Sequence, residues 1–158
     1  MLGEKVVPMG AIAYAFSEEG AGIDGKSFSL LPVEIFYRET GKTKKVTEYP
    51  CDGKLLKAAE QVKTKYHTGR GVIGSGDEWN NQLDRIALLR ERYHTAVEDM
   101  ESAAAAQLCL SYGVPFLGVR ILSNSIVNGE KFDEAVGIDG QKFMLSLVDQ
   151  MKIGRAHV

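Results

Sequence analysis

An almost continuously apolar run, residues 116–122, follows directly on an alanine-rich stretch, and this succession limits what the chain can fold into. The stretch from Met100 to Tyr112 has high helix propensity, and Gly113 and Pro115 mark its end. An apolar run without alternation is typical of a strand that is buried on both faces of a sheet. A helix followed by such a strand therefore predicts an α/β fold.

The same alternation of strands and helices extends through the rest of the chain. Apolar runs between polar or glycine-containing turns predict strands, around Val6–Val7, Ala11–Phe16, Phe28–Phe36, Val46–Tyr49 and Gly71–Gly76. Apolar residues at helical spacing predict further helices, over Leu55 to Tyr66, Leu83 to Ala87 and Phe143 to Met151. Together these elements predict one α/β domain.

Length, charge and cysteine content narrow the class of protein. The chain has 158 residues, a net charge of −2 and 44% hydrophobic residues, which suits one soluble globular domain. With the charge near balance, we expect neither nucleic acid nor an anionic membrane as a partner, and no apolar run is long enough to span a bilayer. The two cysteines, Cys51 and Cys109, fit no metal spacing, so we expect reduced thiols in a cytoplasmic protein.

The last six residues differ from the helical pattern that precedes them. Residues 153–158 break the apolar stripe of the final helix, and a common sequencing adapter translated in this frame would give the same six residues. We therefore expect the domain to span residues 1–152 and the tail to be non-native, and His157 is left out of the site for that reason.

Arg120 interrupts the apolar run, and a guanidinium in a buried strand needs a carboxylate partner or a polar cleft. Candidate partners lie in Val97-Glu98-Asp99-Met100-Glu101, where we expect a helix to begin with acids that its dipole favours. Alternatively, Asp99 caps the helix and the other acids are solvated. A buried arginine and nearby acids occur in many α/β sites, so this pair alone does not identify the chemistry.

The order of several motifs is more specific than any one of them. Gly74-Ser75-Gly76-Asp77-Glu78-Trp79 is followed by the acidic segment 97–101, then by Gly113-Val114-Pro115-Phe116 and Val119-Arg120-Ile121-Leu122-Ser123-Asn124. This order resembles the nucleosidase branch of the nucleoside phosphorylase superfamily, the methylthioadenosine and S-adenosylhomocysteine nucleosidases and their plant storage-protein relatives. That family shows S-G-D-x-F, V-x-M-E-x-A-A, V-P-F and R-x-x-S-D. The resemblance runs from Val6 to about Lys152 and implies a central mixed β-sheet flanked by helices.

The resemblance implies a role in purine nucleoside binding for four of the matched residues. Trp79 would stack on the purine, and backbone groups at Asn80 would hydrogen-bond with the edge of the base. Met100 would lie beneath the ribose. Glu101 would accept hydrogen bonds from the ribose hydroxyls and stabilise the positive charge of an oxocarbenium-like transition state.

Asn124 departs from the adenine-specific members of the family. The resemblance implies that Arg120 holds the acidic cluster, Asp99 included, and that Ser123 orients residue 124. Adenine-specific members have an aspartate there, which protonates N7 of the base, whereas an amide can only donate a hydrogen bond. Losing a positioned general acid typically costs about 10²–10⁴-fold in rate. Phosphorylases that act on 6-oxopurines have asparagine at this place, so purine binding is still expected.

The second departure concerns the N-terminal strands. Gly3-Glu4-Lys5-Val6-Val7-Pro8 resembles the G-D-x-V-V-P piece that follows a glycine-rich segment in the family. The resemblance therefore implies an N-terminally truncated fold. No residue of this chain matches the glutamate that activates the attacking water, and we expect Glu4 and Glu34 to lie at the surface or in turns.

These observations favour a purine nucleosidase that hydrolyses the N-glycosidic bond of adenosine-type nucleosides, with no cofactor and no metal. The resemblance also implies a homodimer, because family members complete their sites across a subunit interface, and a role in methionine salvage. Two alternatives stay open. One is a catalytically silent nucleoside-binding or storage protein, and the other is a 6-oxopurine nucleoside phosphorylase, which would need a phosphate site that the sequence does not reveal.

Overall fold

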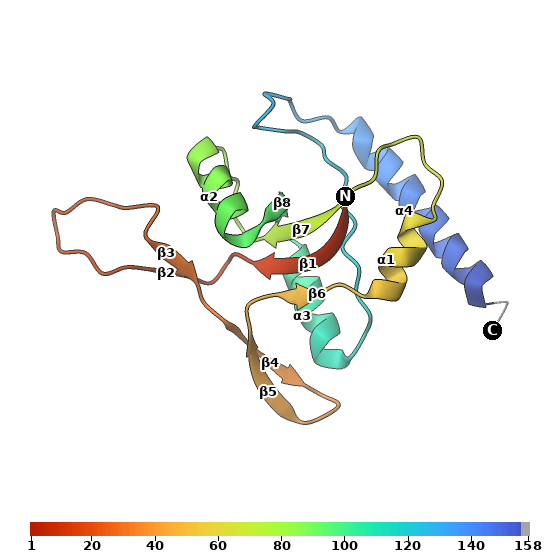
Figure 1. Cartoon of the computed structure of the whole chain (residues 1–158), viewed down its shortest axis with the longest axis horizontal. Helices are drawn as coiled ribbons and strands as arrows, with labels where there is room; N and C mark the ends of the chain where they lie inside the picture. Colours follow the sequence, from red (N-terminus) through yellow and green to blue (C-terminus); the bar gives the residue numbers. More distant parts are fainter. Residues whose placement is uncertain (156–158) are drawn as a thin grey trace.

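A four-stranded mixed sheet forms the centre of the computed structural model, which describes residues 1–155 (Figure 1). Its strands are β1 (Leu2–Pro8), β6 (Tyr49–Pro50), β7 (Arg70–Ser75) and β8 (Thr95–Asp99), in the order β6-β1-β7-β8. Strands β1, β7 and β8 are parallel, whereas β6 pairs with β1 in the antiparallel direction. The expected α/β fold with a central mixed sheet is therefore confirmed.

Helices cover both faces of this sheet. They are α1 (Gly53–Glu60), α2 (Leu83–Tyr93), α3 (Ser102–Tyr112) and α4 (Ala135–Arg155). Successive residues of a strand point to opposite faces. Accordingly, Ile73 packs in a cluster with Ala106 of α3, and its neighbour Val72 packs with Leu89 of α2. The left-handed conformation of Gly113, with φ 68°, ends α3 at the predicted residue.

Two antiparallel hairpins extend from the central sheet. The first pairs β2 (Ile12–Tyr14) with β3 (Phe28–Leu30), and the second pairs β4 (Val33–Tyr37) with β5 (Lys42–Val46). The strand expected over Phe28–Phe36 is thus two strands, separated at Pro32, which has no backbone N–H for a ladder. The β2–β3 hairpin with its long connection, residues 12–30, projects away from the body as an arm (Figure 1).

The prediction of a buried strand over residues 116–122 is wrong. This segment has an isolated antiparallel bridge between Leu2 and Val119, and Leu122 is 56% exposed. Its backbone bonds with the first residues of β1, where Gly3 N donates to Gly118 O at 2.8 Å. Strand β6 pairs with β1 further along, at Lys5 and Val6, so the segment borders only the beginning of β1. That contact is too short to form a regular strand.

The acidic segment also differs from the expectation. Residues 97–99 belong to strand β8, and helix α3 begins only at Ser102, so the segment ends a strand instead of beginning a helix. Helix α4 continues to Arg155, so the expected break at Ile153 is not observed, and residues 156–158 of the predicted tail lie outside the described residues. Within residues 1–155, no helix combines the length and apolar character that crossing a bilayer requires.

Candidate active site

A cleft of about 970 Å³ extends along the edge strand β8 and past its end, and the first residues of β7 also line it. Ligands of open α/β sheets commonly bind at the carboxyl ends of the strands. The cleft is lined by segments that follow β7, β8 and helix α3 in the chain. All eight residues predicted for the site are among its lining residues: Trp79, Asn80, Asp99, Met100, Glu101, Arg120, Ser123 and Asn124. The fold thus gathers residues that are up to 45 positions apart in the sequence.

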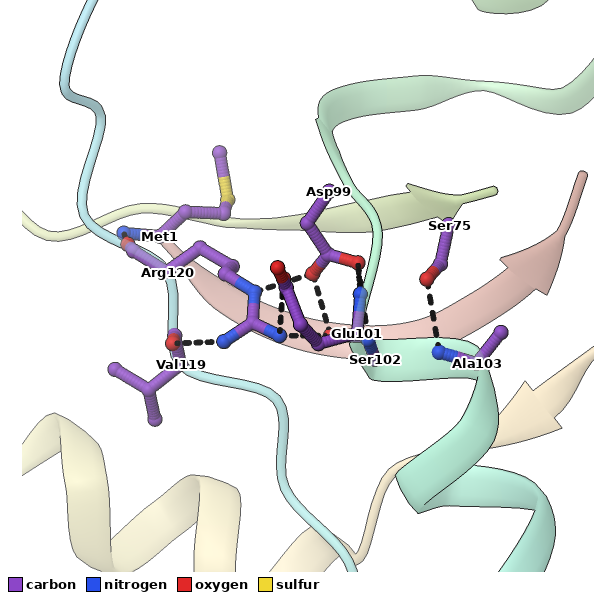
Figure 2. A network of polar contacts seen from close by, with 8 residues as sticks. All are labelled: Met1, Ser75, Asp99, Glu101, Ser102, Ala103, Val119 and Arg120. Atoms are coloured by element: carbon purple, nitrogen blue, oxygen red, sulfur yellow. Dashed lines mark hydrogen bonds and ion pairs between the residues drawn. The ribbon is translucent and has the colours of Figure 1, made fainter. Parts of the chain in front are cut away.

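Four side chains, Ser75, Asp99, Ser102 and Arg120, form a group that we call the floor cluster. Figure 2 shows the bonds that connect Asp99, Ser102 and Arg120, with Ser75 beside them bonded to the backbone of Ala103. Nε of Arg120 donates to Oδ2 of Asp99, and Nη2 of Arg120 donates to Oγ of Ser102 at 2.7 Å. The Ser102 hydroxyl in turn donates to Asp99 Oδ2 at 2.5 Å. The predicted partnership of Arg120 with a carboxylate upstream is therefore present, and the partner is Asp99.

The floor cluster keeps Asp99 ionised. Burial by itself would raise the pKa of Asp99, whose side chain is only 7% exposed. Hydrogen bonds from Ser102, Ser75 and Arg120 act in the opposite direction, and together they hold its pKa below the ordinary value of 3.8. Asp99 is therefore a fixed negative charge that balances Arg120, not a group that exchanges a proton near neutral pH.

Asp99 also bonds with the backbone where the next helix begins, although the N-cap position itself is occupied by Glu101. Its Oδ1 accepts hydrogen bonds from the backbone N–H of Glu101 at 3.2 Å and of Ser102 at 3.0 Å. Its Oδ2 serves the side chains of Arg120 and Ser102. One carboxylate thus fixes the beginning of α3 and the position of the arginine at the same time.

A second group of side chains, Trp79, Asn80, Glu98 and Asn124, forms what we call the cleft wall. The Trp79 side chain is largely exposed, and its indole N–H donates to Asn81 at 3.0 Å. The Asn80 amide donates to both carboxylate oxygens of Glu98, at 3.4 and 3.3 Å. Desolvation at the cleft raises the pKa of Glu98 above its ordinary value, and the Asn80 hydrogen bond opposes that shift.

The remaining predicted residues lie between these two groups. Glu101 is mostly exposed, with its carboxylate 3.8 Å from Nη2 of Arg120, and Met100 is 41% exposed beside it. The Ser123 hydroxyl donates to Oδ1 of Asn124 at 3.2 Å, which fits the orienting role that the resemblance implied for Ser123. This bond uses the oxygen of the amide, so its N–H₂ group remains to donate to a ligand.

Three contributors to the site were missed at the sequence level. Ser75 lies within the glycine motif and is 1% exposed; its hydroxyl accepts from the backbone N–H of Ala103 at 2.8 Å and bonds with Asp99. Ser102 is equally buried, and Glu98 was considered only as a candidate partner of Arg120 or as a solvated acid, not as a group of the cleft wall. A serine that directly follows an acidic segment was the available signal for Ser102. No local signal distinguishes Glu98 from its acidic neighbours.

The cleft offers fixed charges and hydrogen-bonding groups around the aromatic side chain of Trp79. In the part of the chain that the structure describes, no three or more His, Cys, Asp or Glu side chains are grouped as metal ligands. Both cysteines are free, and neither lines the cleft. His94 lines the cleft and also ends helix α2, in a left-handed conformation with φ 60°.

Comparison with known families agrees with this geometry. The model of the phosphorylase superfamily matches residues 2–151, which is nearly the whole chain. The chain belongs to the phosphorylase superfamily. Within this superfamily it is 34% identical over 129 residues to a 5'-methylthioadenosine/S-adenosylhomocysteine nucleosidase of Bacillus pumilus, covering 75% of this chain and 55% of the relative. The enzyme of the same name from Aeromonas salmonicida is 32% identical over 125 residues, covering 75% of this chain and 54% of the relative.

Two solved structures share the fold of this chain. The native futalosine hydrolase of Helicobacter pylori superposes with a TM-score of 0.67 at 21% identity, covering 94% of this chain and 59% of that one. The Helicobacter pylori methylthioadenosine nucleosidase superposes with a TM-score of 0.61 at 22% identity, covering 94% and 59%. The chain thus spans slightly more than half the length of the relatives that it matches.

Proposed function

We propose that this chain carries the base and ribose contacts of a purine nucleosidase that hydrolyses the N-glycosidic bond of adenosine-type nucleosides, of the methylthioadenosine and S-adenosylhomocysteine class. The observation that carries the proposal is that one cleft is lined by all eight residues of the predicted site. The names of the Bacillus pumilus and Aeromonas salmonicida relatives support the same reaction.

The cleft wall would bind the base. Trp79 is 64% exposed, so an indole face is free to stack on a purine. Asn80 and Asn124 would bond with the edges of the stacked base, and Asn124 can donate from its N–H₂ group because its oxygen is bonded to Ser123. These contacts bind a purine without requiring a proton transfer.

Glu101 would act on the sugar. Its carboxylate is 76% exposed and is held only loosely by Arg120 at 3.8 Å, so its oxygens can accept hydrogen bonds from ribose hydroxyls. A carboxylate at that place stabilises the positive charge that develops on the sugar as the bond to the base breaks. Met100 would lie beneath the ribose, and the floor cluster would keep Glu101 at the beginning of α3 through Asp99.

Two parts of the reaction lie beyond these contacts. The family resemblance assigns water activation to a glutamate that no residue of this chain matches, so hydrolysis is proposed for a protein that contains this chain together with that group. The other part is the proton for the departing base, which Asn124 cannot supply.

Asn124→Asp should therefore raise the rate of adenine release, by about 10²-fold or more.

A second copy of the chain would complete the site. The β2–β3 arm carries Phe16 and Ile23, which are 92% and 99% exposed, and exposed apolar side chains on a projecting arm favour contact with another protein surface. A homodimer is the assembly that the family resemblance favours.

The two free cysteines support a cytoplasmic location, and the methylthioadenosine class of substrate supports a role in methionine salvage.

The proposal is tested by measuring the release of free base with chromatography. The chain, alone and joined to the part of the Bacillus pumilus nucleosidase that it does not match, is incubated with methylthioadenosine, adenosine and inosine, with and without phosphate. Base release by the joined protein without phosphate would support the nucleosidase. Release only with phosphate would replace it by a phosphorylase. Purine binding without release from any nucleoside would overturn the enzyme and favour the silent binding protein.

A further inference from the structure

The root of the arm is clamped on helix α2 by two arginines. Phe28, the first residue of β3, is 6% exposed and packs among the rings of Tyr14 and Tyr93. The guanidinium carbon of Arg85 lies 4.5 Å from the Phe28 ring centroid, and that of Arg92 lies 5.4 Å from it. Both distances are within the range of cation–π attraction, so α2 determines where the arm leaves the body.

Arg85 also bonds in a second direction, to the segment that carries Trp79. Its Nε donates to Oε1 of Glu78 at 3.1 Å, and its Nη2 donates to Oε2 at 3.3 Å. Such a two-bond pair fixes the relative orientation of both groups, and the Arg85 side chain is only 14% exposed. Glu78 directly precedes Trp79 and lines the cleft, whereas Arg85 does not.

The segment after β7 is held on either side of the Gly76–Glu78 turn and again beyond Trp79, where Asn80 donates to Glu98. Gly76 N donates to the backbone oxygen of Asp99 at 3.0 Å, which connects the turn to the floor cluster. Glu78 N donates to Gly76 O at 2.8 Å, and the Glu78 carboxylate is held by Arg85. The indole N–H of Trp79 bonds only within its own segment, to Asn81. The Arg85–Glu78 pair therefore connects the Trp79 segment to the arm.

We propose that Arg85 is a positioning residue that couples the root of the β2–β3 arm to Trp79. Its guanidinium lies over the Phe28 ring and donates two N–H groups to Glu78, so a shift of the arm moves the segment on which the purine stacks. By linkage, a ligand that fixes Trp79 also favours one orientation of the arm. The coupling rests on the proposed function in one respect only, because it takes a purine nucleoside as the ligand of Trp79.

Trp79 is the single tryptophan of the chain, so fluorescence excited at a wavelength that tyrosine does not absorb reports on this residue alone. The full chain is compared with Arg85→Lys, Glu78→Gln and Phe28→Leu, and with Arg92→Lys as the matched control. Arg92 also lies over Phe28, but it donates to the Phe28 carbonyl and not to Glu78. Fluorescence anisotropy is measured without ligand, and the affinity for adenosine is measured from quenching. Glu78→Gln preserves the size and shape of the Glu78 side chain, so this is the variant in which an effect is least attributable to unfolding.

The coupling predicts lower Trp79 anisotropy and roughly tenfold weaker adenosine binding in the first three variants, and clearly smaller changes in Arg92→Lys, which leaves the Arg85–Glu78 pair in place. The effect of Phe28→Leu is the most telling, because Phe28 does not line the cleft. Unchanged anisotropy and affinity in Arg85→Lys and Phe28→Leu would overturn the coupling and leave the proposed function intact. If the wild-type chain binds no adenosine, the proposed function fails, and the anisotropy of the ligand-free variants still decides whether Arg85 positions Trp79.

Discussion

Strand β8 contributes neighbouring carboxylates to two regions of the cleft that are held in opposite ways. Asp99, in the floor cluster, is nearly buried and accepts bonds from three side chains and two backbone groups. Glu98, in the cleft wall, is exposed and accepts from the single amide of Asn80. The pKa is lowered for Asp99 and raised for Glu98. The floor is therefore organised by the protein alone, whereas the wall keeps groups available for a ligand.

Breaking the floor cluster should have the largest effect on stability. Arg120→Met leaves the Asp99 carboxylate, with a side chain 7% exposed, without its cationic partner. We expect the free energy of unfolding, from a denaturant titration, to fall by about 3 kcal/mol. The control is Lys5→Met, which removes an ion pair of 2.6 Å that lies at the surface and should change stability by less than about 1 kcal/mol. Equal effects of the two substitutions would contradict the distinction between floor and surface.

The acid dependence of stability should report on Asp99. Because its folded pKa lies below the ordinary value of 3.8, the ionised form stabilises the fold above that pH. This contribution is lost as the pH falls through the folded pKa. Asp99→Asn lacks it, so the stability difference between wild type and variant should shrink as the pH drops below 3.8. A difference that stays constant throughout the acid range would show that Asp99 is not ionised in the cluster.

The wall carboxylate should give a smaller effect of opposite sign. The folded pKa of Glu98 lies above its ordinary value of 4.5, so the folded state holds this proton more tightly than the unfolded state. That contribution is present below pH 4.5 and disappears as the pH rises through the folded pKa. Glu98→Gln should therefore gain stability relative to wild type as the pH rises, measured in the same titrations. The reverse trend would mean that Glu98 is ionised in a stabilising ion pair.

The sequence predicted the floor cluster better than the strand that was expected to carry it. An always-charged arginine inside an apolar run requires a carboxylate, and this physical need identified Arg120 and the acidic segment before any coordinates. Whether residues 116–122 form a strand depends instead on which strand lies beside them. The segment lies along the same edge of β1 as strand β6, which ends 66 positions before residue 116 in the chain. No local pattern contains this information.

The supporting serines and the arm illustrate the same limit. Ser75 and Ser102 owe their role to the approach of β7, β8 and α3, which short-range patterns do not describe. Pro32 was the signal that Phe28–Phe36 is two strands. It was overlooked because apolar residues on both sides of it make the run look continuous. The family motifs, by contrast, pointed to residues that line one cleft: two of these motifs lie at or just after the ends of β7 and β8, and a third is the irregular segment 119–124 that follows α3.

The central claim is that the cleft wall binds a purine against Trp79, and quenching of the single tryptophan by methylthioadenosine tests it most directly. The account predicts saturable quenching that free adenine competes with and that Asn124→Ala weakens, while Trp79→Phe still binds in calorimetry because a phenyl ring also stacks. Quenching that does not saturate, together with no heat of binding from methylthioadenosine, adenosine or inosine, would contradict it.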